Sequence, residues 1–361
     1  MSDARRRRGY LDWMRGLAVL VMIEAHVIDS WTRPEARRSW QFMWSIIVGG
    51  FGAPLFLFLA GASVALSAGS KCRRSGSAAD AARAVMRRGG WVFFLAFVFR
   101  VQAWILGLAA PWTLLKVDIL NIMGPAIVAA AALWGLLGSS RRRVVGLSAA
   151  AVATTLLAPL VWDAAVLDRW PEAFAGYLRP TRGLSNFSLF PWAGFVFAGG
   201  ALGVLIDDAR PGEAERKLNL RLFAAGIALA AAAYAGSWGR SPYAHSDFWG
   251  ASPAFFLLRT GIMMAATACA YGWESRPRMF GSWSPMQLFG RHSLLIYWIH
   301  VEMVYGLISL RIHRGLSLPA VWVALGFFTL FMLGCAAARE RYSARRTAAP
   351  TPPAPSACPA P

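Results

Sequence analysis

A histidine with acid–base capacity lies about fourteen residues into the first long apolar segment, which spans residues 11–31. A bilayer core holds few ionisable groups because each is costly there, so those it does hold are candidates for function. With 100° between successive residues, one side of a helix formed by this segment carries Asp12, Arg15, Met22, His26 and Asp29. Glu24 falls roughly opposite His26. We therefore interpret this side as one wall of a polar cavity that contains the imidazole of His26.

The composition indicates a membrane protein. The chain has 361 residues, 57% of them hydrophobic, and a mean hydropathy of +0.45, which is too apolar for a soluble domain. Its 17 Trp and 22 Phe residues suit lipid-facing surfaces and interfacial belts. The net charge of +19 would suggest nucleic acid in a soluble protein. Here the charges lie mainly between apolar runs, so membrane topology explains them better and we predict no nucleic-acid partner.

Sequence signatures of several other chemistries are missing. There is no G-x-S-x-G, P-loop or dinucleotide fingerprint, and no H-E-x-x-H or comparable histidine–carboxylate spacing. We therefore predict no metal site. No C-x-x-C motif occurs either, and free thiols are expected at Cys72, Cys269, Cys335 and Cys358.

Ten apolar segments are long enough to cross a hydrocarbon core of about 30 Å. They lie near 11–31, 45–68, 89–109, 117–137, 143–162, 187–207, 219–238, 253–274, 287–310 and 316–338. The sequence thus predicts an all-α fold, a polytopic transmembrane bundle of about ten helices. We expect an integral, multi-pass protein of a bacterial-type inner membrane whose partner is the lipid bilayer; the oligomeric state stays open, a homodimer included.

Basic residues are concentrated in alternate loops, which fixes the predicted orientation. The side that is rich in basic residues includes the N-terminal Arg5–Arg8, the loop from Lys71 to Arg88 and Arg141–Arg143. Both termini are therefore expected in the cytoplasm. We divide the chain into a basic N-terminus (1–10), a single transmembrane domain (11–342) and a disordered Pro/Ala-rich tail (343–361).

Several predicted helices carry ionisable or amide side chains at a similar depth, in the outer half of the bilayer. Besides His26 they are Arg100, Gln102, Lys116, Asp118, Asn121, Arg259, His300 and Glu302. We expect them to line one outward-facing cavity. The alternative is that some form structural ion pairs, such as Arg100 with Asp118, or reach the interface.

Five stretches, in order along the chain, match a known group of enzymes. They are Leu11-Asp-Trp-Met-Arg-Gly-Leu-Ala-Val-Leu20, Ala53-Pro-Leu-Phe-Leu-Phe-Leu-Ala-Gly61, Val117-Asp-Ile-Leu-Asn-Ile-Met-Gly124, Phe190-Pro-Trp-Ala-Gly194 and Gly290-Arg-His-Ser-Leu-Leu-Ile-Tyr-Trp-Ile-His300. Together they resemble the membrane-embedded acetyltransferases related to the catalytic domain of heparan-alpha-glucosaminide N-acetyltransferase. More distantly, the chain is similar to the broader group of integral membrane sugar acyltransferases.

This resemblance implies transfer of an acetyl group from cytoplasmic acetyl-CoA to an amine or hydroxyl of a saccharide on the far side of the membrane. It also implies a histidine that acts as acyl acceptor or general base. In the heparan enzyme and its close relatives that histidine follows the first matched helix, but here the segment 32–41 contains none. His26, inside the helix, is closer to the arrangement of the broader group.

Acyl transfer needs a base for the attacking group and donors for the oxyanion, which assigns roles to the polar residues. We predict His26 as the base and Asp29, three residues further on, as the carboxylate that orients it. Arg15 is assigned to the phosphates of coenzyme A, which the arginines of the 71–88 and 141–143 loops could also meet. The predicted substrate or oxyanion groups are Arg100, Asp118, Asn121, Arg259 and His300.

Two hypotheses follow from this pattern. The first is a membrane acetyltransferase that uses acetyl-CoA and a saccharide acceptor. The second is a proton-coupled transporter or exporter of a small or lipid-linked substrate, in which the same buried groups relay protons. The acceptor, N- versus O-acetylation and the existence of an acyl-histidine are left open by the sequence.

Overall fold

The computed structural model describes residues 8–107, 110–244, 248–276 and 283–348. Within these ranges the secondary structure is helical, with no β-strand beyond two isolated bridges. In chain order the α-helices are α1 (Gly9–Trp31), α2 (Trp40–Gly49), α3 (Gly52–Ser75), α4 (Ala78–Gly107), α5 (Ile119–Leu136), α6 (Ser140–Trp162), α7 (Glu172–Leu178), α8 (Leu189–Asp208), α9 (Glu213–Gly236), α10 (Pro253–Glu274), α11 (Pro285–Arg291), α12 (Ser293–Tyr305) and α13 (Leu318–Ala348). Short 3₁₀ helices occupy Pro34–Arg38, Pro111–Leu115, Ala165–Arg169 and Leu307–Ser309.

The bundle has the length and apolarity of a polytopic membrane protein, as predicted. In the described part of the chain, seven helical stretches are long and apolar enough to cross a bilayer: Trp40–Ser75, Ile119–Leu136, Ser140–Trp162, Leu189–Asp208, Glu213–Gly236, Pro253–Glu274 and Leu318–Arg345. Helix α1 is continuous over 23 residues, but charged side chains interrupt its apolar sequence. Helix α12 has only 13 residues. Each of the ten predicted segments nevertheless coincides with one or more helices.

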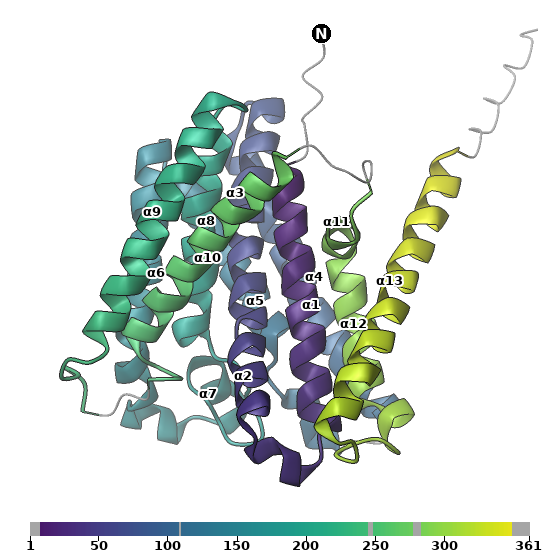
Figure 1. Cartoon of the computed structure of the whole chain (residues 1–361). Helices are drawn as coiled ribbons and strands as arrows, with labels where there is room; N and C mark the ends of the chain where they lie inside the picture. Colours follow the sequence, from purple (N-terminus) through teal and green to yellow (C-terminus); the bar gives the residue numbers. More distant parts are fainter. Residues whose placement is uncertain (1–7, 108–109, 245–247, 277–282, 349–361) are drawn as a thin grey trace, which may run out of the picture.

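Helix α1 begins and α13 ends at the same end of the bundle (Figure 1). This agrees with the expectation that both termini lie on one side. Helix α13 continues to Ala348, so residues 343–348 extend a helix where the sequence predicted the start of a disordered tail. Residues 349–361 lie outside the described part of the chain.

Two predicted segments are each broken into two helices. The segment 45–68 is interrupted between Gly49 and Gly52, where α2 gives way to α3. The segment 287–310 is interrupted at His292, whose backbone leaves the helical region at φ −111° and ψ 20°. Glu340 of α13 holds this second break, because its carboxylate lies 2.6 Å from His292 Nε2 and 2.9 Å from Arg291.

Close helix contacts at glycines set the relative positions of the elements that matter for function. A Cβ at Gly199 of α8 would overlap the carbonyl oxygen of Phe58 in α3, and one at Gly61 would overlap that of Val196. In the same way, a Cβ at Gly290 of α11 would overlap the carbonyl oxygen of Asp12 in α1. Small residues allow such backbone approach between membrane helices. Figure 1 shows the result for α1, which lies beside α11 and α12, with α13 on their outer side.

The α3–α8 contact leads to a stability prediction. Gly199→Ala should lower the midpoint of thermal unfolding in detergent, because overpacking a tight contact costs about 1–3 kcal/mol. The matched control is Gly326→Ala in α13, where a Cβ meets no atom within 4 Å. That variant should unfold at or slightly above the temperature of the parent protein, since alanine favours helix. Equal midpoints for the two variants would contradict the close packing of α3 against α8.

Candidate active site

Two histidines from opposite ends of the sequence meet toward the end of the bundle where α1 ends and α13 begins, which we call the outer end after the predicted orientation. His26 of α1 places Nδ1 2.9 Å from Nε2 of His300 in α12. The rings are nearly parallel, with an interplanar angle of 18°. His300 is completely buried, whereas His26 is half-buried and lines a cavity.

The hydrogen bonds fix which ring nitrogens carry protons when both imidazoles are neutral. His300 Nδ1 lies 2.7 Å from the carbonyl oxygen of Ile296, which can only accept, so this nitrogen must donate. The Nε2 of a neutral His300 then has no proton and accepts from Nδ1 of His26. His26 is thereby left with an unprotonated Nε2. This arrangement orients a base in the way that a carboxylate orients the histidine of a catalytic triad.

Asp29 does not take the role predicted for it. One of its carboxylate oxygens lies 3.3 Å from the guanidinium of Arg37, and the other accepts a hydrogen bond from the Tyr305 hydroxyl at 3.3 Å. Arg37 follows the end of α1, so the carboxylate is drawn toward the outer rim. Asp29 therefore lines the same cavity as His26, but the partner of His26 in the described contacts is His300.

The cavity at the outer end has a volume of about 470 Å³. We call it the outer cavity. Its polar side chains come from α1, α4, α12 and the segments that lead into α5 and α8. They are His26, Asp29, Arg100, Thr113, Lys116, Asp118, Asn186, Tyr297, Glu302 and Tyr305. The prediction that separate helices direct their rare charges to one chamber thus holds for α1, α4 and α12.

Arg100 and Asp118 form an ion pair in the wall of the outer cavity, with a separation of 2.6 Å. Their side chains are only 13% and 14% exposed. Asp118 also caps the start of α5: its carboxylate accepts from the Ile119 amide, and its backbone N–H donates to Oδ1 of Asn121. Asn121 is 1% exposed and donates to the Tyr177 hydroxyl, so it lies behind the wall rather than in the cavity. Arg100 and Asp118 therefore form the structural ion pair that the sequence offered as the alternative to a catalytic role.

Two further charged residues, Lys116 and Glu302, face the outer cavity and form no ion pair within the described part of the chain. Lys116 lies beside Arg100, and burial, with a contribution from Arg100, lowers the pKa of this lysine. Glu302 of α12 has a buried carboxylate oxygen, Oε1, that makes no hydrogen bond. Such a group is costly unless something binds to it, which makes Glu302 a candidate for contact with a substrate.

Arg259 does not belong to this site. Its guanidinium lies over the ring of Phe255 at 3.8 Å and near that of Phe51 at 5.8 Å. Helix α10 packs mainly against α9, and Arg259 reaches the glycine break between α2 and α3 rather than the outer cavity. The predicted depth of Arg259 in the bilayer does not show on which side of α1 its helix, α10, lies.

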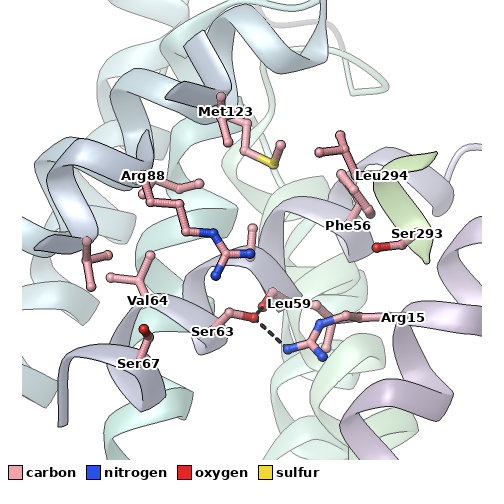
Figure 2. A pocket seen from close by; sticks show the side chains of 14 residues that line it. Arg15, Phe56, Leu59, Ser63, Val64, Ser67, Arg88, Met123, Ser293 and Leu294 are labelled. Atoms are coloured by element: carbon pink, nitrogen blue, oxygen red, sulfur yellow. Dashed lines mark hydrogen bonds between the residues drawn. The ribbon is translucent and has the colours of Figure 1, made fainter. Parts of the chain in front are cut away.

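A second hollow lies toward the other end of the bundle and is shown in Figure 2. We call it the inner pocket; its volume is about 120 Å³. Arg15 enters it from α1, forms an ion pair with Asp12 and donates to the Ser63 hydroxyl at 2.7 Å. Arg88 of α4 lines the same pocket, so two guanidinium groups from different helices face one small space.

The inner pocket continues toward the end of the bundle where α3 meets α4. A neighbouring hollow of about 370 Å³ shares Ser67, Val85 and Arg88 with it and adds Lys71 and Arg74. Four cations thus line these two neighbouring hollows, which together we call the inner path. Such a path suits a ligand that carries several negative charges.

Two aromatic side chains, Phe56 and Tyr297, lie between the inner pocket and the outer cavity, and we call them the Phe56–Tyr297 partition. Phe56 lines the pocket and stacks on Tyr297, which lines the cavity, with ring centroids 6.4 Å apart. Tyr297 also contacts His300 edge to face, with centroids at 5.7 Å. The sequence assigns no role to Phe56, Tyr297 or Ser63, because each looks like an ordinary helix residue until the fold brings it to a hollow. Arg88 is one of the basic-loop arginines expected near the phosphates of coenzyme A.

A multi-pass helical bundle with a histidine pair at one hollow, and a second hollow lined by arginines beyond an aromatic contact, is an architecture suited to chemistry across a membrane. The chain matches the model of the family described as acyltransferase domain over residues 8–340. The protein therefore belongs to this family of membrane acyltransferases, and it is an integral membrane protein. Of the two resemblances drawn from the sequence, the match supports the broader acyltransferase group. No curated protein matches the chain.

Substitutions in the Arg100–Asp118 ion pair can test whether it stabilises the contact between α4 and α5. Arg100→Met leaves Asp118 buried without its partner and should destabilise the protein by about 3–5 kcal/mol. Adding Asp118→Asn should recover much of that loss, because an amide can still accept at the start of α5. The measurement is the thermal midpoint of the two single variants and the double variant in detergent. Additive effects, with no recovery in the double variant, would show that the pair does not hold α4 to α5.

Proposed function

We propose that the protein transfers an acetyl group from acetyl-CoA, bound from the predicted cytoplasmic end, to a hydroxyl or amine of a saccharide in the outer cavity. Membership of the acyltransferase family supports the class of reaction. The observation that carries the rest is the hydrogen-bond chain from Ile296 through His300 to His26, because it leaves an unprotonated Nε2 in a polar cavity.

The path lined by Arg15, Arg88, Lys71 and Arg74 is the proposed site for the phosphates of acetyl-CoA. Arginine pairs bind phosphate oxygens well because their donors form a planar fork. Eleven residues of helix separate Arg15 from His26, about 16 Å at 1.5 Å per residue. An extended pantetheine arm is of similar length, so phosphates at Arg15 would bring the thioester close to His26. The arm would pass Phe56 and Tyr297, whose rings must turn aside.

The chemistry at the outer end follows from the protonation of the two rings. Nε2 of His26 takes the proton of the acceptor O–H or N–H while the acceptor atom attacks the thioester carbonyl carbon. The carbonyl electrons return as the C–S bond breaks, and the thiolate of coenzyme A leaves and receives the proton from His26. During this step His300 accepts the Nδ1–H bond of the imidazolium and so stabilises its charge. Lys116 lies close enough to the cavity to offset negative charge on the carbonyl oxygen.

His26→Gln should reduce acetyl transfer by about 100- to 10,000-fold, the usual contribution of a general base. The assay follows radiolabelled acetyl-CoA with purified protein in vesicles and measures free coenzyme A and labelled acceptor. The matched control is His313→Gln, since His313 bonds Ser30 and does not line the outer cavity. Full activity of His26→Gln would exclude this base. Flux of a solute across the vesicles without any need for acetyl-CoA would favour the transporter instead.

Arg88→Ala should raise the KM for acetyl-CoA and leave the KM for the acceptor unchanged, because Arg88 faces only the inner path. Each good charge-assisted contact is worth about 1.5–3 kcal/mol, or roughly 10- to 150-fold in affinity. The neighbouring Arg87 lies outside the inner pocket and is the control. Arg87→Ala should keep the parent KM for both substrates. The same KM in Arg88→Ala and the parent protein would move the donor site elsewhere.

A further inference from the structure

We propose that the acceptor carries a lipid tail and reaches the outer cavity sideways from the bilayer, between α4 and α12. This inference rests on the proposed function and adds the physical class of the acceptor, a membrane-anchored saccharide. The outer cavity beside His26 is lined by α1, α4, α12 and the segments that lead into α5 and α8. Helix α12 packs directly against α1, and α4 packs directly against α5. By contrast, α4 and α12 make almost no close backbone contact with each other, although both line the outer cavity.

Side chains bridge the space between α4 and α12. Trp298 Nε1 donates to Gln102 Oε1 at 2.7 Å, and the Phe99 ring meets Trp298 edge to face with centroids 5.2 Å apart. We call these three side chains, Phe99, Gln102 and Trp298, the lateral seam. A single hydrogen bond between two membrane helices is generally weak. Rotation of Trp298 would therefore open the seam without separating any packed pair of helices.

The surroundings of the lateral seam differ on its two sides. Near it, α4 exposes Val98, Val101 and Ile105, and α12 exposes Leu295. These apolar side chains suit contact with acyl or isoprenoid chains. Inside it lie Arg100, adjacent to Phe99, and Glu302, one turn beyond Trp298.

A molecule that crosses the seam thus meets apolar surface first and polar groups second. The buried Oε1 of Glu302 has no hydrogen-bond partner and can accept from a sugar hydroxyl or amine. An amphiphile with a saccharide head and an apolar tail matches this order. A free saccharide matches only the inner half of it.

The seam can be locked chemically to test this proposal. The full chain would carry Gln102→Cys and Trp298→Cys, with Cys72, Cys269, Cys335 and Cys358 replaced by serine, and would be reconstituted in phospholipid vesicles. A bismaleimide then joins α4 to α12. Acetyl transfer from labelled acetyl-CoA is measured before and after cross-linking to two acceptors: hexadecyl glucosaminide in the bilayer and methyl glucosaminide in solution. Each single-cysteine protein treated with the same reagent is the control for modification without cross-linking.

Cross-linking should abolish transfer to hexadecyl glucosaminide while transfer to methyl glucosaminide continues. Unchanged transfer to both acceptors, or equal loss of both, would overturn the lateral route and leave the acyltransferase function standing. Transfer to methyl glucosaminide alone, even before cross-linking, would show that the acceptor arrives from the aqueous side. Absence of acetyl transfer to either acceptor before cross-linking would overturn the proposed function itself, and the lateral route with it.

Discussion

The hydrogen bond between His26 and His300 depends on the positions of two helices that are separated by more than 260 residues of sequence. A distance of 2.9 Å between ring nitrogens leaves little tolerance for shifts of α1 against α12. The bond also decides the chemistry, because it assigns the proton of His26 to Nδ1 and leaves Nε2 as the base. A small displacement of α12 would therefore change both the position and the protonation of the reactive nitrogen.

Two contacts at some distance from the histidines supply this precision. Gly290 lets α11 approach the backbone of α1 at Asp12, which fixes the start of the α11–α12 unit. Glu340 of α13 binds both Arg291 and His292 at the break, which fixes the direction in which α12 leaves. The break itself is needed, because α12 can then turn independently of α11 and present His300 to His26. At the outer end, the bridge between Thr32 and Leu316 ties the end of α1 to the start of α13.

The sequence predicted the helical segments well and the pairing of side chains less well. Long apolar runs with basic loops define membrane helices through the cost of burying charge, so the ten segments could be placed without knowledge of their packing. The same cost made His26, Arg100, Asp118 and His300 candidates. Which of them meet depends on the lateral arrangement of helices, and depth along a helix carries no information about that. For this reason Arg259 was grouped with the wrong chamber.

The buried charged side chains are of two kinds, those in ion pairs and those without one. Arg100 and Asp118 satisfy each other and hold the start of α5, so their charges are accounted for within the protein. Glu302 and Arg88 face hollows and form no ion pair among the described residues, although Arg100 is near enough to Glu302 to interact with it electrostatically. An unpaired charge inside a membrane bundle lowers the stability of the folded protein. Its retention is most simply understood if a ligand completes it, an anionic donor at Arg88 and a hydroxyl- or amine-bearing acceptor at Glu302. The two unpaired charges lie on opposite sides of the Phe56–Tyr297 partition, as a reaction that joins substrates from two sides of a membrane requires.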